Sequence, residues 1–402
     1  MFSRRSEYAE SNNRLSRLLH EQRGRGCQIL DLTESNPTRA DFSYPDQEIL
    51  AALAEPASLL YQPAPLGLLK AREAIADYYA QRGGQQQRST VNPEHILLTA
   101  STSEAYSYLF KILADPGDQV LVPQPGYPLF EFLARGESVE ALPYRLLYQD
   151  GWQIDIESLS RQISPRSRAL VLIHPNNPTG SFVKAEEWTV IQNLCARHNL
   201  SIICDEVFFD FPLESSLNPV DPLCHSPLFD SGVLIFVLNG LSKIVGLPQM
   251  KLSWLVPKGP AAKTQDALRR LEVISDTFLS VNTLIQHATA KLLPLRRIFQ
   301  QQVRQRTSSN LEFLQEILEG STATVLKVEG GWYAIIRLAQ TRTEEEWVLH
   351  LLEQYDLLLH PGYFYDFSRE AFVVASLIPP EKAFREGTQR LLQACSEHLR
   401  AP

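Results

Sequence analysis

The chain has 402 residues, of which 44% are hydrophobic and 21% are charged. This composition is typical of a globular protein and excludes a fibrous or largely disordered one. The length exceeds what one hydrophobic core usually organises, so two or three lobes are expected. The formal net charge of -8 disfavours a nucleic-acid partner, because such a partner needs a basic face that displaces counterions from phosphates.

The cysteines and the N-terminus bear on the cellular location of the protein. The five cysteines are odd in number and have no CxxC or CxxH spacing, which predicts neither a disulfide framework nor a metal site. The polar N-terminus lacks the apolar core of a signal peptide, and no run approaches the roughly 18 apolar residues of a membrane helix. We therefore expect a cytoplasmic protein with no membrane partner.

The first elements are short. A polar segment of helical character precedes a short strand at 29–32, and the turn-rich stretch 33–38 follows it. From Leu68 the apolar residues recur at helical spacing, which predicts an amphipathic helix that stops at Gly83 and Gly84.

The middle of the chain alternates strands with helices. Short apolar runs predict strands, and segments such as 186–197 between them have helical patterns. This alternation predicts a mostly parallel sheet with crossover helices. The predicted strands are 95–99, 119–123, 168–174, 200–205 and 233–238.

The last third has a different character. Helical patterns over 260–293 and 296–318 lead to strands at 325–338 and 370–377, which flank a helix at 344–354 and precede a closing helix from Glu381. This part is α+β and forms a smaller lobe. We predict a large domain at 46–292 and a small domain made of 1–45 and 293–402.

In a sheet of this kind, ligands bind beyond the carboxyl ends of the strands, so the residues there are the candidates for a site. The hydroxyls of Ser101, Thr102 and Ser103 open a helix, where free backbone N–H groups suit a phosphate. An ordinary N-cap completed by Glu104 explains the same residues. Tyr127 follows a rigid Pro/Gly turn, where its ring either covers a flat heterocycle or packs within the loop.

Three further strand ends carry polar groups. Asn177, within the Pro/Gly-rigid stretch 175–180, presents an amide able to donate to an anionic oxygen, or else makes an Asx turn. Asp205 ends a buried strand, where a carboxylate is costly unless a protonated nitrogen pairs with it. Lys243 follows another buried strand; desolvation there would free its amine to attack a carbonyl, although most such lysines are solvated.

Together these groups describe a site for pyridoxal 5'-phosphate, and the sequence resembles the class I/II aminotransferases of the type I pyridoxal-phosphate fold from about Asp31 to about Leu392. The motifs that carry the resemblance are AsnAsnProThrGly at 176–180, AspGluValPhe at 205–208 and SerLysIleValGlyLeuPro at 242–248. The resemblance implies a large α/β domain, whose mostly parallel sheet lies between helices, and a smaller α+β domain.

The resemblance also implies a role for each candidate. Lys243 is the Schiff-base lysine, Asp205 the partner of the pyridine nitrogen, and Tyr127 the aromatic that stacks on the ring. Asn177 donates to the ring O3', beside Phe208. The phosphate is held by Ser101, Thr102, Ser103, Ser242 and Lys251, together with Tyr61 of the neighbouring subunit, which implies a homodimer.

The chain departs from the family at several positions. Lys251 replaces an arginine, Gly240 replaces a phosphate-binding serine, and Phe208 replaces a tyrosine that donates to O3'. Val374 stands where the family carries the arginine that clamps the substrate carboxylate. Either a second arginine replaces it, with Arg39, near Asn36, or Arg369 as candidates, or the amino donor lacks that carboxylate; we favour the first.

The predicted function is transfer of an amino group between an amino acid or related amine and a 2-oxo acid. One alternative is a pyridoxal-phosphate lyase of the C–S β-elimination type, which uses the same cofactor residues. A member that binds the cofactor without turnover is a further alternative. A regulator fused to a DNA-binding domain is disfavoured by the acidic charge and by the absence of a separate domain before Asp31.

Overall fold

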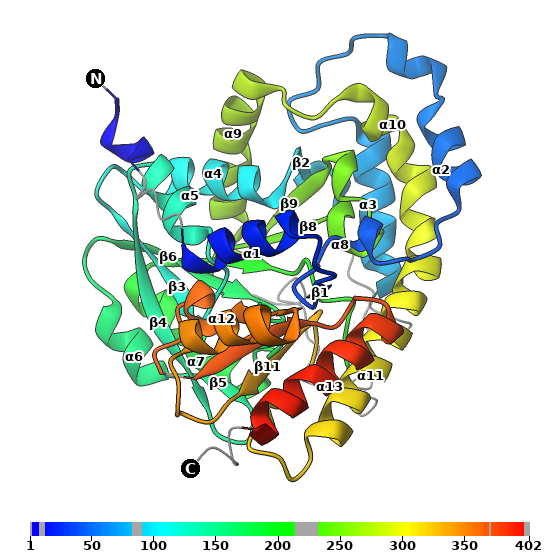
Figure 1. Cartoon of the computed structure of the whole chain (residues 1–402). Helices are drawn as coiled ribbons and strands as arrows, with labels where there is room; N and C mark the ends of the chain where they lie inside the picture. The colour runs from blue at the N-terminus through cyan, green and yellow to red at the C-terminus, as the bar shows by residue number, and fades with distance from the viewer. Residues whose placement is uncertain (1, 8–12, 83–90, 214–231, 370, 398–402) are drawn as a thin grey trace.

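The computed structural model describes residues 2–7, 13–82, 91–213, 232–369 and 371–397. The predicted helix stop at Gly83–Gly84 and one of the five cysteines, Cys224, lie outside these ranges. A large sheet occupies one part of the molecule, and a smaller sheet with helices α12 and α13 occupies the other (Figure 1). No helix within the described ranges is long and apolar enough to cross a membrane.

The large sheet has eight strands in the order β2-β9-β8-β7-β6-β3-β4-β5. From β8 to β4 every neighbouring pair is parallel, whereas β9 and β5 run antiparallel to their neighbours. The predicted mostly parallel sheet is therefore confirmed. Its strands are β2 (Leu97–Thr99), β3 (Gln119–Gln124), β4 (Glu140–Tyr148), β5 (Trp152–Ile154), β6 (Ser167–Ile173), β7 (Ser201–Asp205), β8 (Ile235–Gly240) and β9 (Ser253–Lys258).

Helices cover both faces of this sheet. Strand β8 shows why: Ile235 and Val237 pack into one core and Phe236 and Leu238 into another. Each such buried side chain contributes roughly 2 kcal/mol. The first core includes residues of α2 (Asp46–Leu53), α3 (Leu69–Arg82), α6 (Ile156–Gln162), α7 (Ala185–His198), α8 (Leu241–Ile244), α10 (Thr283–Leu292) and α11 (Arg296–Leu318), and the second includes residues of α4 (Thr102–Leu113), α5 (Phe130–Gly136) and α9 (Ala261–Phe278).

The smaller part has its own core and its own sheet. Four strands lie in the order β10-β11-β14-β13, and β1 pairs with β12 beside them. Helix α11 also packs on α13, so one long helix serves both parts. The elements are α1 (Arg14–Gly24), β1 (Leu30–Asp31), β10 (Thr324–Val325), β11 (Tyr333–Arg337), α12 (Glu344–Tyr355), β12 (Leu357–Leu358), β13 (His360–Pro361), β14 (Phe372–Ser376) and α13 (Glu381–Glu397).

Short 3-10 helices complete the chain. They are η1 (Arg4–Ser6), η2 (Pro37–Arg39), η3 (Pro56–Leu59), η4 (Pro93–His95), η6 (Pro248–Met250), η7 (Leu293–Leu295) and η8 (Gly362–Tyr365).

Two sequence predictions of local structure were wrong. The stretch 325–338 was predicted as one strand, but it is split into β10 and β11. Two glycines explain the split: a Cβ on Gly330 would meet the Phe182 ring at 2.8 Å, and Gly331 has a φ of +85°. Between β10 and β11 the backbone leaves the sheet and contacts the segment after β7. There the Gly331 N–H donates to the Phe211 carbonyl at 2.8 Å.

The strand predicted at 233–238 was placed two residues too early: β8 begins at Ile235, and Gly240 is its last residue. Its neighbour across the strands is Ser253 of β9. A Cβ on Gly240 would lie 2.2 Å from the Ser253 hydroxyl oxygen and 3.0 Å from its Cα. Glycine therefore allows a close approach of two paired strands, and a serine at 240 would require one of them to shift.

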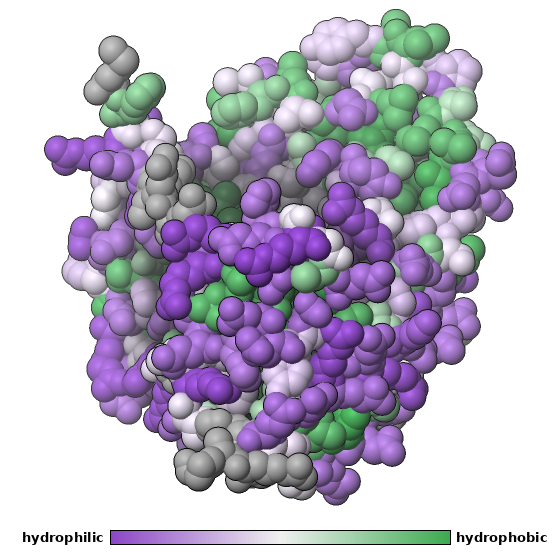
Figure 2. Space-filling view, viewed as in Figure 1, coloured by the Kyte–Doolittle hydropathy of each residue, from purple (hydrophilic) through white to green (hydrophobic). Residues whose placement is uncertain are grey.

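Part of the surface is apolar. Leu50, Leu59 and Leu60 are exposed, and 91% of the Leu59 side chain is accessible. Figure 2 shows hydrophobic residues gathered over the region of α2 and α10. Most of the remaining surface in that view is hydrophilic.

Candidate active site

Lys243 lies in α8, one turn after the end of β8. Its Nζ is 4.7 Å from the centre of the Trp332 ring and 5.3 Å from that of Phe208. Burial lowers the pKa of the Lys243 amine from its ordinary 10.5 to about 8, although Asp205 partly opposes this shift. The amine therefore loses its proton more readily than an exposed lysine does, as a nucleophile or a base requires.

Asp205 ends β7, the strand beside β8, and is buried. Its carboxylate accepts hydrogen bonds from the Tyr106 hydroxyl at 3.2 Å and the Val207 N–H at 3.1 Å. Burial nevertheless raises the pKa of Asp205 to about 6. A cationic partner at this carboxylate would offset the cost of its burial.

Asn177 lies just after β6, on the other side of β7. Its side-chain Oδ1 is buried and has no hydrogen-bond partner within the described part of the chain. The neighbouring Asn176 makes the local turn instead, because its Oδ1 accepts from the Thr179 hydroxyl at 2.9 Å. The Asn177 Oδ1 is therefore an acceptor left for a ligand, since buried polar groups are rarely unpaired in proteins.

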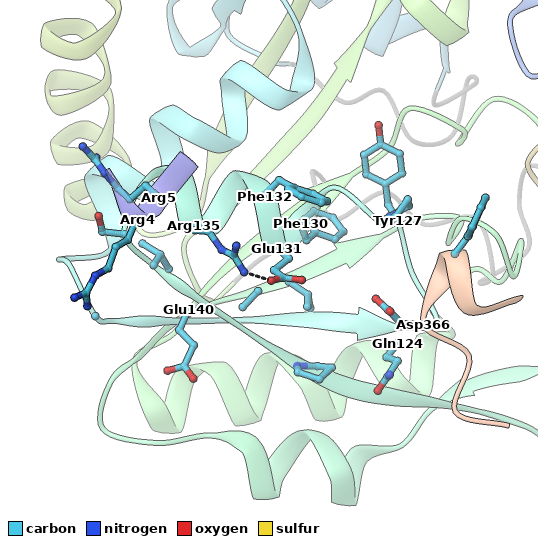
Figure 3. A pocket seen from close by; sticks show the side chains of 18 residues that line it. Arg4, Arg5, Gln124, Tyr127, Phe130, Glu131, Phe132, Arg135, Glu140 and Asp366 are labelled. Atoms are coloured by element: carbon cyan, nitrogen blue, oxygen red, sulfur yellow. Dashed lines mark hydrogen bonds and ion pairs between the residues drawn. The ribbon is translucent and has the colours of Figure 1, made fainter. Parts of the chain in front are cut away.

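Tyr127 follows β3 and is 37% exposed. Burial and then the Asp205 carboxylate raise the pKa of its hydroxyl. The ring packs edge-on against Phe130, with 6.1 Å between the ring centres. Figure 3 shows Tyr127 at one end of a pocket of about 890 Å³, which continues along α5 to Arg4 and Arg5.

The predicted phosphate residues lie at the starts of two helices. Ser101 caps α4: its hydroxyl accepts from the Glu104 N–H at 3.1 Å, and Glu104 in turn accepts from the Ala100 N–H at 2.7 Å. The N-cap interpretation is therefore confirmed, and the serine hydroxyl proton is still able to donate to an anion. Thr102 and Ser103 form the first turn of α4.

Ser242 and Lys251 flank the lysine turn. Ser242 is partly buried in α8, whereas Lys251 is exposed and adopts a φ of +51° at the end of η6. Tyr61 lies farther out, after η3, with 73% of its surface accessible. It lines a small pocket with Leu98 and Ser280.

The substrate-side candidates are at the surface. Arg39 is the exposed last residue of η2, and Arg369 is exposed before β14. Asn36 caps η2, and its Oδ1 accepts from the Thr38 N–H at 3.1 Å and the Thr38 hydroxyl at 2.8 Å. Val374 is buried, and its neighbours across the strands are Ile335 and His360.

Several residues near the site were not anticipated from the sequence. Tyr106 and Trp332 contact Asp205 and Lys243, as described above. Tyr333 and Tyr365 lie at a centroid distance of 6.5 Å, and the Tyr365 hydroxyl is 3.0 Å from Nδ1 of His360. The sequence carries one indication of these contacts. The adjacent glycines 330 and 331 indicate a close approach of the backbone to another segment, just before Trp332 and Tyr333.

Known proteins resemble this chain in sequence. The family model described as aminotransferase class I and II matches residues 28–376. The glutamate-pyruvate aminotransferase AlaA of Escherichia coli is 29% identical over 267 residues, which cover 65% of this chain and 63% of that protein. Thus the chain spans less than two thirds of the length of that relative. The Haemophilus influenzae AlaA is 25% identical, over 93% of this chain and 92% of that protein.

Solved structures have the same fold. An alanine aminotransferase from Pyrococcus furiosus superposes with a TM-score of 0.86 at 23% identity, covering 99% of this chain and 100% of that one. A Thermus thermophilus aspartate aminotransferase mutant superposes with a TM-score of 0.83 at 23% identity, covering 98% and 99%. The predicted type I fold is confirmed.

Proposed function

Because the chain belongs to the aminotransferase class I and II family, we propose that it is a pyridoxal-phosphate-dependent transaminase that moves an amino group between an amino acid or related amine and a 2-oxo acid. The observation that carries this proposal is the Lys243 amine, which lies against the rings of Phe208 and Trp332 with a lowered pKa, beside the strand that ends in Asp205. The names of the relatives support the same reaction class.

The residues of the site fit pyridoxal phosphate. Asn177 has a buried, unpaired amide oxygen, and Asp205 is a buried carboxylate whose pKa is raised by burial to about 6. Ser101, Thr102, Ser103, Ser242 and Lys251 would hold the phosphate, and Tyr127 would cover the ring. When bound, the cofactor supplies an electron-withdrawing ring that makes the proton on the substrate Cα acidic.

Each side chain of the site has a separate role in the proposed reaction. Asp205, oriented by the Tyr106 hydroxyl and the Val207 N–H, would hold a proton on the ring nitrogen. Lys243 would supply the amine that holds the cofactor and would move the proton at the substrate Cα. Phe208 and Trp332 pack against Nζ, and burial makes this amine less basic than an exposed lysine.

The test is a half-reaction. The holoenzyme is mixed with single amino donors, and the cofactor spectrum is followed without an acceptor. We expect stoichiometric conversion to the amine form of the cofactor, which a 2-oxo acid then reverses. Release of ammonia and a 2-oxo acid without that conversion would instead indicate a lyase.

We also propose a homodimer in the cytoplasm, with domains at 46–292 and at 1–45 plus 293–402. The exposed Tyr61, Leu59 and Leu60 support the dimer, because large exposed apolar residues near one another mark interaction surfaces. Sedimentation of the full chain tests this: we expect a dimer, and a monomer at the working concentration of the active enzyme would contradict it. In a dimer, Leu59→Glu should favour the monomer.

A further inference from the structure

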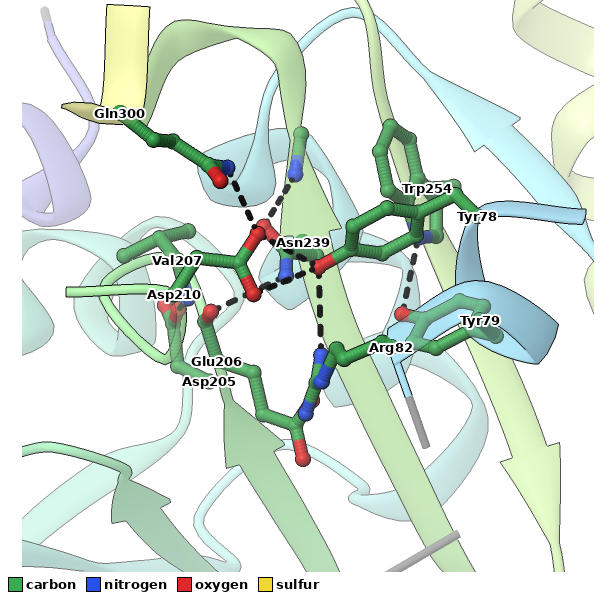
Figure 4. A network of polar contacts seen from close by, with 11 residues as sticks. Tyr78, Tyr79, Arg82, Asp205, Glu206, Val207, Asp210, Asn239, Trp254 and Gln300 are labelled. Carbon is green, nitrogen blue, oxygen red and sulfur yellow. Dashed lines mark hydrogen bonds and ion pairs between the residues drawn. The ribbon is translucent and has the colours of Figure 1, made fainter. Parts of the chain in front are cut away.

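A buried polar network lies beside the strand ends that carry Asp205 and Lys243 (Figure 4). Glu206, the residue after Asp205, is fully buried, and Arg82 of α3 pairs with it at 2.5 Å between Nη2 and Oε2. The Arg82 guanidinium also lies 3.6 Å from the centre of the Phe209 ring. A buried carboxylate is tolerated only when it is paired, so this ion pair fixes the backbone that follows Asp205.

One side chain links that backbone to the strand before Lys243. The Asn239 Nδ2 donates to the Glu206 carbonyl at 3.0 Å, and the Asn239 Oδ1 accepts from the Gly240 N–H at 2.8 Å. Asn239 is fully buried. The ends of β7 and β8 are therefore held together by side-chain bonds in addition to the sheet ladder.

A second link comes from α11. The Nε2 of Gln300 donates to the Asp210 Oδ2 at 2.9 Å and to the Ile244 carbonyl at 3.2 Å. Ile244 follows Lys243 directly, and Asp210 lies five residues after Asp205. Asp210 is itself held by the Tyr78 hydroxyl at 3.1 Å. Gln300 thus joins the segment after Asp205 to the turn that carries Lys243.

We propose that Gln300 is a positioning residue for Lys243: its amide holds the lysine turn against the Asp205 segment, so that the amine stays packed against Phe208 and Trp332. Within the described ranges, the Gln300 amide contacts the site at the Ile244 carbonyl and the Asp210 carboxylate. The inference rests on the proposed function, because Lys243 is the reactive amine there. Without the Gln300 bonds, the short helix α8 is free to move and the amine gains access to water.

The experiment measures the Lys243 amine in the full chain freed of cofactor. The protein is pulsed with acetic anhydride across a pH series, and acetylation of the Lys243 peptide is compared by mass spectrometry with that of the exposed Lys291. Gln300→Met keeps the length of the side chain but removes both donors. We expect its Lys243 midpoint to rise by about half a pH unit or more, because a better-solvated amine holds its proton more strongly.

The neighbouring Gln301 gives a matched control, since it lies on the same helix and is exposed. Gln301→Met should keep the wild-type midpoint. Equal midpoints in wild type and Gln300→Met, both below that of Lys291, would overturn the inference alone. A wild-type Lys243 that titrates like Lys291 would remove the basis of the proposed function as well.

A second variant covers the case in which Gln300→Met does not fold. Gln300→Glu keeps the shape, but it places a carboxylate where the amide now donates to Asp210, and the two charges repel. We expect a rise in the Lys243 midpoint in the same direction, with Gln301→Glu as its control. A midpoint unchanged from wild type in folded Gln300→Glu would overturn the inference.

The holoenzyme gives an independent reading. The pH midpoint of the cofactor absorbance should differ from the wild-type value in Gln300→Met and equal it in Gln301→Met. If Gln300→Met only lowered the stability of the fold without changing the site, both variants would keep the wild-type midpoint.

Discussion

The strand ends around Asp205 and Lys243 are enclosed by buried side chains, whereas the rim that carries Arg39, Tyr127 and Arg369 is exposed. On the enclosed side, the two buried carboxylates have defined partners, Tyr106 for Asp205 and Arg82 for Glu206. On the rim, the Asn36 side chain hydrogen-bonds within its own turn. We therefore propose that the enclosed side determines the chemistry and that the exposed rim determines the choice of substrate. The predictions below separate these two sides.

The largest effect should come from the enclosed side. Lys243→Ala removes the proposed base and nucleophile, so the rate of the half-reaction should fall by about four orders of magnitude. Rapid-mixing spectroscopy of the cofactor measures this rate. Lys291→Ala, at an exposed lysine that pairs with Glu55, should leave it unchanged. A loss of less than about tenfold in Lys243→Ala would contradict the assigned role.

Asp205→Asn should have the next largest effect. The change keeps the shape of the side chain and removes the buried negative charge, so kcat should fall by about 100- to 1,000-fold. Affinity for the cofactor should fall less, because the phosphate groups are untouched. Parallel measurements of kcat and of cofactor dissociation test this, and an unchanged kcat would refute the proposed pairing with the ring nitrogen.

The rim should respond more weakly. Arg39→Ala and Arg369→Ala test which arginine holds the substrate carboxylate, and one of them should lower kcat/KM for amino acids by about tenfold or more, the usual contribution of a charged hydrogen bond. Arg269→Ala, at an exposed arginine of α9, is the control. Unchanged kcat/KM in both test variants would favour an amino donor that lacks this carboxylate.

Phe208→Tyr should shift a pKa and leave most of the rate intact. The Phe208 ring lies 5.3 Å from the Lys243 Nζ, and it has no hydroxyl to donate to a charged oxygen. A tyrosine there should lower the pH midpoint of the cofactor absorbance by about one unit, because it stabilises the charged form. Spectral titration of wild type and Phe208→Tyr measures both midpoints. An equal or higher midpoint in Phe208→Tyr would contradict the predicted hydrogen bond.

Stability should depend on pH through the same two residues in the cofactor-free chain. The pKa of Lys243 falls from 10.5 to about 8 on folding, so the unfolded chain binds more protons between these values and stability rises with pH there. The pKa of Asp205 rises from 3.8 to about 6, so the folded chain binds more protons and stability falls as pH rises through that window.

Denaturant unfolding across pH measures both slopes. Lys243→Met should flatten the alkaline slope and Asp205→Asn the acidic one. Slopes identical to those of wild type would show that neither group titrates as described.

Much of the large sheet could be predicted because its strands are continuous apolar runs bounded by turn residues. For β6 and β7, the predicted and observed bounds differ by at most one residue at each end. Strands β4, β5 and β9 were missed. Two of these, β9 and β5, pair antiparallel outside the alternating strand-helix pattern.

The sequence by itself determined which polar groups stand at the strand ends, because strand, turn and helix starts are local patterns. Asp205, Asn177 and Lys243 could be named in this way. The contacts that set their state were decided only by tertiary structure: Tyr106 comes from 99 residues before Asp205, and Gln300 reaches Ile244 across 56 residues. Such contacts depend on how α4 and α11 pack against the sheet, and no local pattern encodes that packing.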